Sequence, residues 1–374
     1  MSAAARAHLL LEDGLDLAGS IAGAPFAVCG EVVFNTAMAG YPETLTDPSY
    51  AGQILVLTYP LIGNYGVPLT GGPGGEAGRL QSDRIQVAGL VIQQLAVQHS
   101  HFLAAQTLAE WCASHDVPIL QGVDTRTLTR RLRERGTMQG WIYPATLGRD
   151  EALATACGVE MSAEVFRRVA PLETVRYPGG ELRVLLVDIG AKDGIVHCLR
   201  KRGATVIRAP WHADLLALAG EADGIMLSNG PGDPAHLGAL TEQVRQLLST
   251  FHGPIFGICL GHQVLARAAG FETYKLKYGH RGVNQPVRDL ETGRCYISSQ
   301  NHGYAVDISR GVAGWVPWFD NLNDGTNEGL RCLDRPVFSV QFHPEGQPGP
   351  EDTEFLFDRF LELAAALRRP TGAQ

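Results

Sequence analysis

One cysteine of this chain stands between two glycines at a spacing that suits a nucleophile. Cys259 forms the pattern G-x-C-x-G with Gly257 and Gly261, after an apolar run at residues 254–258 and before a Leu/Val/Ala-rich run at helical spacing. This arrangement is the thiol counterpart of the strand-to-helix elbow that presents a nucleophilic serine. The start of a helix favours the thiolate, which is the reactive form. We therefore predict a nucleophilic thiol, the alternative being a buried core cysteine.

A histidine and a glutamate near the end of the chain could supply the proton transfers that such a thiol needs. His343 and Glu345 follow an apolar run and are separated by a proline. Residues two apart on an extended chain share a face, so His343 can reach the thiol while Glu345 orients and charges the imidazole. Three other histidines lack such an acidic neighbour and are predicted to be structural: His262, His280 and His302.

A glycine-containing loop, SNGPGDP at residues 228–234, follows another apolar run. Gly230 and Gly232 permit positive φ angles and a close backbone approach, which suits N–H groups that donate to an oxyanion. A simple Gly/Pro turn is the alternative interpretation. Because the G-x-C-x-G segment follows, we favour the functional interpretation, with the amide of Leu260 as a further donor.

These loops require a scaffold that brings the ends of several strands together. From residue 182 the sequence alternates short apolar strands with helices, which predicts a doubly wound, mostly parallel sheet with its site beyond the carboxyl ends of the strands. Residues 273–307 indicate antiparallel strands inserted before the chain returns to the sheet, and a helix at 353–367 closes the domain.

The N-terminal half has a different pattern, with several short strands between 8 and 65 separated by Gly/Pro/Asp/Ser turns. Further along we predict a strand at 87–97, an amphipathic helix at 102–115, a strand at 117–125 and a helix between Asp124 and Gly136. Gly- and Pro-containing residues 144–181 indicate a linker. The predicted division is therefore a domain at 1–143, a linker at 144–181 and a domain at 182–374.

Composition excludes several classes of protein. The 374 residues carry a formal charge of −8, which gives no electrostatic footprint for nucleic acid. No apolar stretch reaches 18 residues, so no membrane span is expected. None of the four lysines follows a glycine, so the chain holds no Walker A sequence for ATP. Seven cysteines without a C-x-x-C pair indicate neither a disulfide framework nor a zinc knuckle, and fit a cytoplasmic protein.

The motifs GICLGHQ, SNGPGDP and HPE, in this order, resemble those of class I glutamine amidotransferases. The N-terminal motifs EVVFNTAMAGYPETLTDPSY, LTYPLIGNYG and DTRTLTRRLRERG extend the likeness, over almost the entire chain, to the small subunits of carbamoyl-phosphate synthase. This resemblance implies the class I glutaminase fold for residues 182–374. For the first domain it implies a β-rich swivelling β/β/α fold.

The resemblance also implies roles for individual residues. Cys259 corresponds to the nucleophile, His343 to the base and Glu345 to its partner. The positions that correspond to glutamine-binding residues are Ser49, Gly230, Gly232, Leu260, Gln263, Asn301, Gly303 and Tyr304. Ser49 lies in the first domain, so the pocket would be completed across the domain interface. Tyr304 stands where the family has phenylalanine, which leaves its packing open.

The implied reaction is hydrolysis of L-glutamine through a thioester, with the ammonia passed to a large synthetase subunit that makes carbamoyl phosphate for arginine and pyrimidine synthesis. The two subunits would form a heterodimer, with ATP and Mg²⁺ bound only by the large subunit and no cofactor or metal in this chain. Three alternatives remain: an amidotransferase subunit serving anthranilate, guanylate or cytidine nucleotide synthesis, a non-catalytic regulatory paralogue, and a cysteine peptidase.

Overall fold

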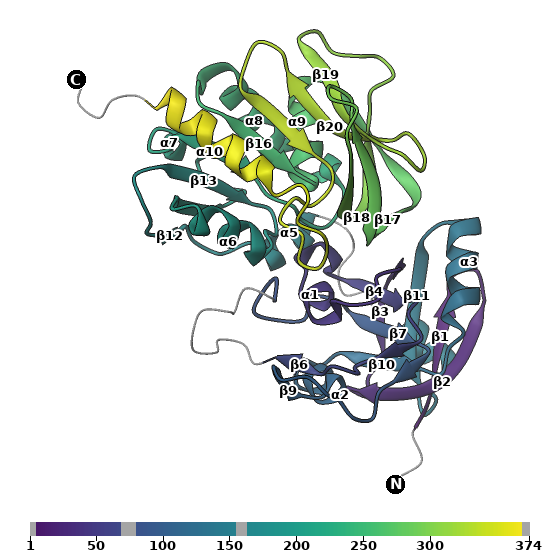
Figure 1. The fold of residues 1–374 in the computed structure, drawn as a ribbon. Helices are drawn as coiled ribbons and strands as arrows, with labels where there is room; N and C mark the ends of the chain where they lie inside the picture. Colours follow the sequence, from purple (N-terminus) through teal and green to yellow (C-terminus); the bar gives the residue numbers. More distant parts are fainter. Residues whose placement is uncertain (1–4, 69–79, 155–162, 369–374) are drawn as a thin grey trace. The chain divides into compact units, whose positions relative to one another are not determined.

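The computed structural model describes residues 5–68, 80–154 and 163–368, which fall into two units (Figure 1). Their boundary lies between Met161 and Ser162. Each unit has apolar clusters of its own. The segment 144–181, expected to be a linker, contains α4 (Arg149–Leu153), α5 (Ala163–Val169) and β12 (Val175–Tyr177).

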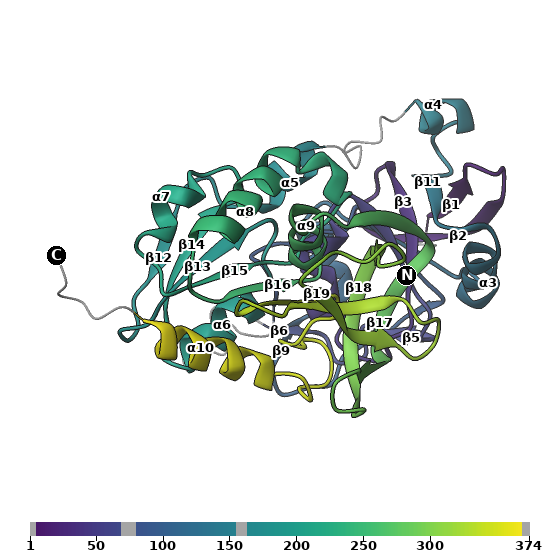
Figure 2. The ribbon, with the colours of Figure 1, turned by 90° about the horizontal axis from the view of Figure 1, so that it is seen from above.

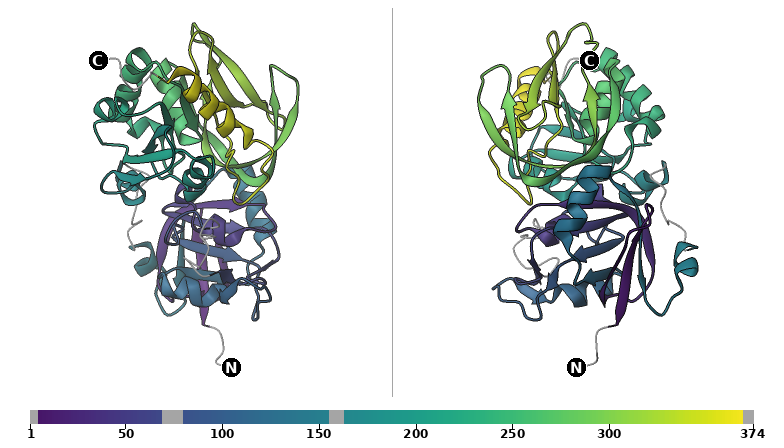
Figure 3. Two further views of the ribbon diagram at one scale, coloured as in Figure 1. Left: turned by 60° about the vertical axis from the view of Figure 1, so that its left-hand side comes forward. Right: turned by 90° about the vertical axis from the view of Figure 1, so that its right-hand side faces the viewer.

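The first unit is built on a closed barrel whose strands, coloured purple to blue in Figure 3, follow the order β1-β11-β3-β4-β7-β10-β2. Strands β3, β4, β7 and β10 are parallel neighbours, and the other pairs are antiparallel. The elements are β1 (Arg6–Leu11), β2 (Asp16–Gly23), β3 (Val28–Asn35), α1 (Tyr41–Leu45), η1 (Pro48–Tyr50), β4 (Gln53–Leu57), β5 (Leu61–Ile62), β6 (Val67–Pro68), β7 (Gly89–Ile92), β8 (Gln94–Leu95), β9 (Ala104–Gln106), α2 (Leu108–Ser114), β10 (Pro118–Gln121), α3 (Thr125–Arg135) and β11 (Met138–Pro144).

The helix predicted at 102–115 begins later than expected. Residues Ala104–Gln106 form β9, which pairs with β6, and α2 starts only at Leu108. Thr107 caps this helix, and its side chain and that of Glu110 satisfy each other's backbone N–H groups in a capping box. The sequence T-x-x-E was the signal for the true start.

The second unit contains one ten-stranded sheet in the order β12-β14-β13-β15-β16-β21-β20-β19-β17-β18. Strands β14, β13, β15, β16 and β21 are parallel neighbours, as the alternating pattern predicted, and the remaining pairs are antiparallel. The elements after β12 are β13 (Arg183–Asp188), α6 (Asp193–Lys201), β14 (Thr205–Pro210), α7 (Leu215–Ala219), β15 (Gly224–Leu227), η3 (Pro234–His236), α8 (Gly238–Thr250), β16 (Ile255–Ile258), α9 (Leu260–Ala269), β17 (Glu272–Asp289), β18 (Cys295–Asp307), β19 (Trp315–Asn321), β20 (Asn327–Cys332), β21 (Val337–Val340) and α10 (Phe355–Leu367).

Helices cover both faces of the parallel part of this sheet. Figure 2 shows α6 and α10 on one face and α7, α8 and α9 on the other. A large apolar cluster lies under α6 and α10, where Phe256 and Phe338 of the sheet meet Phe357 and Phe360 of α10. Burial on both faces explains why these strands read as nearly continuous apolar runs.

The antiparallel part of the sheet is an arm formed by β17 to β20, in which β17 and β18 make the long green hairpin of Figure 3. The register of β17 against β18 shifts between Lys275 and His280 and again between Gly282 and Gln285. Bulges of this kind bend a hairpin and redirect its side chains. They precede and follow the stretch of β17 that pairs with Asn301 and His302.

The composition led to expectations about membrane spans and about cysteines. Among them, no helix has the length and apolar character needed to cross a membrane. Five of their cysteines carry free thiols: Cys112, Cys198, Cys259, Cys295 and Cys332. Cys29 is disulfide-bonded, which the cysteine spacing had not indicated.

Candidate active site

Cys259 lies at the elbow between β16 and α9, as its flanking glycines predicted. Its φ and ψ angles are 53° and −104°, a positive φ that is rare outside glycine. A Cβ atom on Gly257 would lie 2.7 Å from the carbonyl oxygen of Gly261, and one on Gly261 would lie 2.2 Å from that of Leu227. The two glycines are therefore required because the backbone of the turn is packed against itself and against β15.

Contacts with β21 and β18 hold the elbow in place. The backbone N–H of Cys259 donates to the carbonyl of Val340, the last residue of β21, at 2.8 Å. Its Sγ lies 3.6 Å from the carbonyl oxygen of Asn301 on β18. Leu260 begins α9, and the first N–H groups of a helix have no partner within the helix. The buried thiol therefore lies beside unpaired amide donors of the kind that stabilise an oxyanion.

His343 and Glu345 follow β21 and lie together at this edge of the sheet. The backbone N–H of His343 donates to the carbonyl of Ser299 at 2.9 Å, which fixes the chain after the strand. Nδ1 of His343 and Oε1 of Glu345 are 2.7 Å apart, and both side chains are buried. The glutamate therefore fixes the orientation of the imidazole and leaves Nε2 as the second nitrogen available for proton transfer.

Lys192, which sequence reasoning missed, completes this cluster. Its Nζ lies 3.0 Å from Oε1 of Glu345 and donates to the carbonyl of Gly346 at 2.6 Å, and the side chain is 2% exposed. The residue immediately precedes α6, at the carboxyl end of β13. A fully buried lysine is rare unless it is paired, so its type and position after a strand were the available signals.

The charges of this cluster act on one another. Burial works to lower the pKa of His343, but the Glu345 carboxylate and then the Cys259 sulfur outweigh it, so the pKa is raised. Burial works to raise the pKa of Glu345, but Lys192 and His343 lower it strongly. Nε2 of His343 makes no hydrogen bond of ordinary length with a described residue. The site thus favours an imidazolium beside the thiol, with a carboxylate behind it.

The loop after β15 carries Gly230 and Gly232 close to the elbow. A Cβ atom on Gly230 would lie 2.3 Å from the carbonyl of Ile189 and 2.8 Å from Cδ2 of Leu260. Gly232 has a φ of 84°, and a Cβ atom there would lie 2.9 Å from the ring of Phe166. Only glycine fits at both positions, and the loop contacts the residue that follows the nucleophile.

Residues of β18 reach the same edge. The side-chain nitrogen of Gln263 donates to the carbonyl of Tyr304 at 2.9 Å and to Oε1 of Gln341 at 3.0 Å. These bonds join the first turn of α9 to the 301–304 stretch of β18 and to the chain after β21. Tyr304 is itself half-buried. Seven of the eight positions matched to glutamine binding thus belong to segments that contact the elbow or one another in the second unit: Gly230, Gly232, Leu260, Gln263, Asn301, Gly303 and Tyr304.

Ser49 belongs to the first unit. It lies in η1, and its backbone N–H donates to Oδ1 of Asp47 at 2.9 Å. The side chain is 7% exposed. Its assignment to glutamine binding stays a prediction, because the other matched positions belong to the second unit.

Two family models match this chain, one in each half. The family model of the class-I glutamine amidotransferases matches residues 185–363, and that of the carbamoyl-phosphate synthase small chain matches residues 9–142. Among solved structures, a glutamine amidotransferase of Methylobacillus flagellatus aligns with 15% identity and a TM-score of 0.39, over 52% of this chain and 97% of that one.

Curated relatives match over nearly all of the chain. The carbamoyl phosphate synthase arginine-specific small chain of Emericella nidulans is 46% identical over 96% of this chain and 79% of its own length. The multifunctional protein URA2 of Saccharomyces cerevisiae is 44% identical over 95% of this chain, which spans 17% of that protein. The multifunctional protein pyr-3 of Neurospora crassa is 45% identical over 96% of this chain, which spans 21% of that protein. The chain thus spans about a fifth of the multifunctional relatives, and it belongs to the carbamoyl-phosphate synthase small chain family, with a class-I glutamine amidotransferase domain.

Proposed function

We propose that this chain hydrolyses the side-chain amide of L-glutamine at Cys259 and delivers the ammonia to a separate synthetase subunit that makes carbamoyl phosphate. The observation that carries the proposal is the buried line of Lys192, Glu345 and His343 beside a thiol on a strained elbow. A histidine oriented by a carboxylate and placed beside a thiol is the arrangement that activates a cysteine nucleophile.

In the first half of the reaction the Cys259 thiolate attacks the amide carbon of glutamine. The carbonyl oxygen becomes an oxyanion, which the amide of Leu260 and a glycine amide of the 230–232 loop stabilise, each by about 3 kcal/mol. His343 then gives its proton to the amide nitrogen, the C–N bond breaks and ammonia leaves. The product on the enzyme is a thioester between Cys259 and the glutamyl group.

In the second half a water molecule attacks the thioester while His343 takes its proton. The C–S bond breaks, glutamate leaves and the thiolate is restored. The sum is glutamine plus water giving glutamate plus ammonia. Glu345 keeps the imidazole oriented in both halves, and Lys192 keeps Glu345 ionised.

Free ammonia is protonated in water, so its use for synthesis requires a sheltered route to the partner. The proposed partner is the ATP-using large subunit, in a heterodimer in the cytoplasm, with ATP and Mg²⁺ bound there and no cofactor taking part in glutamine hydrolysis by this chain. The names of the Emericella nidulans relative and of its counterparts support an arginine-specific role, whereas pyrimidine synthesis rests on the resemblance alone.

The first experiment measures ammonia release from glutamine by the wild type, Cys259→Ser and His343→Asn. Loss of activity in both variants is expected, because one removes the nucleophile and the other the proton-transfer group. Wild-type rates in either variant contradict the proposal. Covalent labelling of Cys259 by a glutamine-mimic electrophile distinguishes an active glutaminase from a non-catalytic paralogue. Co-purification with a candidate large subunit, followed by glutamine-dependent carbamoyl phosphate formation, tests the partner.

A further inference from the structure

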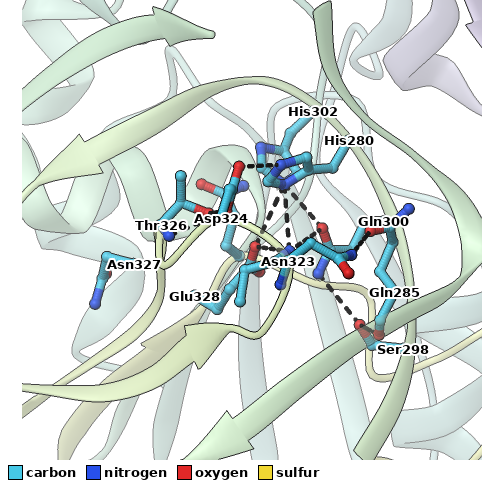
Figure 4. A network of polar contacts seen from close by, with 12 residues as sticks. His280, Gln285, Ser298, Gln300, His302, Asn323, Asp324, Thr326, Asn327 and Glu328 are labelled. Atoms are coloured by element: carbon cyan, nitrogen blue, oxygen red, sulfur yellow. Dashed lines mark hydrogen bonds and ion pairs between the residues drawn. The ribbon is translucent and has the colours of Figure 1, made fainter.

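A second buried cluster of histidines and carboxylates lies in the antiparallel arm of the second unit (Figure 4). His280 of β17, His302 of β18 and Glu328 of β20 are 8%, 5% and 0% exposed. One ligating atom from each of them lies within 4.8 Å of the others. The proposed glutamine chemistry uses none of these three side chains, although His302 stands between two residues matched to glutamine binding.

The spacing of the ligating atoms is close to that of a metal site. Oε1 of Glu328 lies 3.5 Å from Nδ1 of His280 and 3.9 Å from Nε2 of His302. Oε1 of Gln300 lies 3.3 Å from the same Nε2. Four ligands held tetrahedrally at zinc distances are about 3.3–3.5 Å apart. Shifts of well under 1 Å between side chains would bring the Glu328 contacts into that range.

Both histidines have the outer contacts that metal-binding histidines need. Nδ1 of His302 lies 2.8 Å from the carbonyl oxygen of Tyr304, which can only accept, so Nδ1 carries the hydrogen. Nε2 of His280 lies 2.8 Å from Oδ2 of Asp324, a carboxylate–histidine contact. Metal-binding histidines usually donate the remote ring N–H to a carbonyl or carboxylate in this way. Each imidazole therefore turns its other nitrogen toward Glu328.

The centre of the cluster needs a positive charge. With its hydrogen on Nδ1, a neutral His302 presents the lone pair of Nε2 to two acceptors, the side-chain oxygens of Gln300 and Glu328. The orientation of the Gln300 amide is set, because its nitrogen donates to Oγ of Ser298 at 3.3 Å. Oε2 of Glu328 is buried with no hydrogen-bond partner among the described residues. A buried lone pair that faces only acceptors costs free energy unless a cation or a proton lies between them.

We propose that His280 Nδ1, His302 Nε2 and Glu328 Oε1 bind a divalent transition-metal ion, with Gln300 Oε1 as a fourth ligand and Zn²⁺ as the ion that fits best. Two imidazoles and one carboxylate form a ligand set that zinc readily accepts. The side-chain nitrogen of Asn321 now lies 3.1 Å from Oε1 of Glu328, and 3.5 Å from both Nδ1 of His280 and Oε1 of Gln300, so it must move away for the ion to bind.

The role of such an ion is structural. It joins β17, β18 and β20, and it fixes His302, whose Nδ1 contacts the Tyr304 carbonyl that also accepts from Gln263. Removal of the ion is expected to loosen this stretch of β18 and to raise the KM for glutamine more than it lowers kcat. That last consequence rests on the proposed function, whereas metal binding itself does not.

The test measures metal content in the full chain without an affinity tag. Protein treated with EDTA is incubated with Zn²⁺, freed of excess ion and analysed by mass spectrometry for zinc per chain. The variants are Glu328→Gln and His280→Gln, and the matched control is His252→Gln, which changes an exposed histidine of the same unit. One zinc per chain is expected in the wild type and the control, with at least tenfold less occupancy in the two variants.

Cobalt gives a second measurement that needs no variant. Co²⁺ added to the wild type is expected to show visible absorption of a four-coordinate nitrogen–oxygen site, displaced by Zn²⁺, and both ions are expected to raise the melting temperature. The proposal is overturned if the wild type retains no stoichiometric metal, if Glu328→Gln and His280→Gln bind as much as the control, or if a thiolate-to-cobalt band places the ion on a cysteine. Glutaminase activity without zinc binding overturns this inference alone, and zinc binding without glutaminase activity overturns only the proposed function.

Discussion

The second unit buries two clusters in which histidine lies beside a carboxylate. They differ in whether a lysine of the chain lies next to that carboxylate and supplies a positive charge. Beside Cys259, Lys192 lies within ion-pair distance of Glu345 and keeps it ionised next to His343. In the antiparallel arm, no lysine or arginine of the described chain is within that distance of Glu328, which faces His280 and His302. The first cluster carries its own cation, whereas the second needs a proton or a metal ion. Similar residue types therefore suit proton transfer in one place and metal binding in the other.

Loss of the internal cation is expected to have the largest effect. Lys192→Met leaves the buried Glu345 carboxylate without its cation, and breaking a buried ion pair in this way costs about 3–5 kcal/mol. Urea unfolding measures the change in the free energy of unfolding. The control is Lys201→Met, whose partner Glu354 is in a partly exposed pair, and there a cost of about 0–1 kcal/mol is expected. Equal losses in the two variants would show that Lys192 has no special role.

Loss of the carboxylate that orients the histidine should rank next. Glu345→Gln keeps the shape of the side chain but removes the charge that holds the His343 imidazolium, so kcat for glutamine hydrolysis is expected to fall about 100-fold. Glu328→Gln, the matched change in the other cluster, is expected to leave kcat within about threefold and to act on metal content and KM. Steady-state kinetics of both variants give the comparison, and a larger fall in kcat for Glu328→Gln would reverse it.

The outer carboxylate of the second cluster is predicted to have a smaller effect. Asp324→Asn replaces the group that contacts Nε2 of His280, so zinc affinity is expected to fall about 10- to 100-fold while one ion still binds at saturation. Competition with a chelator of known affinity measures this. An unchanged affinity would mean that Asp324 does not orient the metal-facing nitrogen.

The pH dependence of stability should show the smallest effect. The pKa of His343 is raised in the folded protein, so its contribution to stability is complete below its ordinary value of about 6.5 and is lost as pH rises above it. The pKa of Glu345 is lowered, so its contribution is complete above about 4.5 and is lost only in stronger acid. Between pH 6.5 and 9.5 the wild type is therefore expected to lose more stability than His343→Asn, as urea unfolding at each pH would show. A parallel decline in both proteins would remove His343 as its cause.

Much of the fold could be predicted because its signals are local. The alternation of strands and helices after residue 182 gave the parallel sheet, and the helix from Thr125 to Arg135 followed from Asp124 and Gly136 at its ends. The predicted start of helix α2 was wrong, because residues Ala104–Gln106 form strand β9 and pair with β6 instead of joining the helix. The closed barrel of the first unit depends on pairings between distant strands, such as β1 with β11, which spacing alone does not reveal.

The sequence by itself determined the elbow and the histidine–glutamate pair. Gly257, Cys259 and Gly261 lie within five residues, and His343 and Glu345 within three, so backbone geometry alone relates their side chains. Only the tertiary structure decided that Lys192 pairs with a glutamate 153 positions later, and that His280 and His302, expected to be structural, face Glu328 across three strands. Their proximity comes from the order and register of the sheet, which depend on burial over the whole unit and not on any short run of residues.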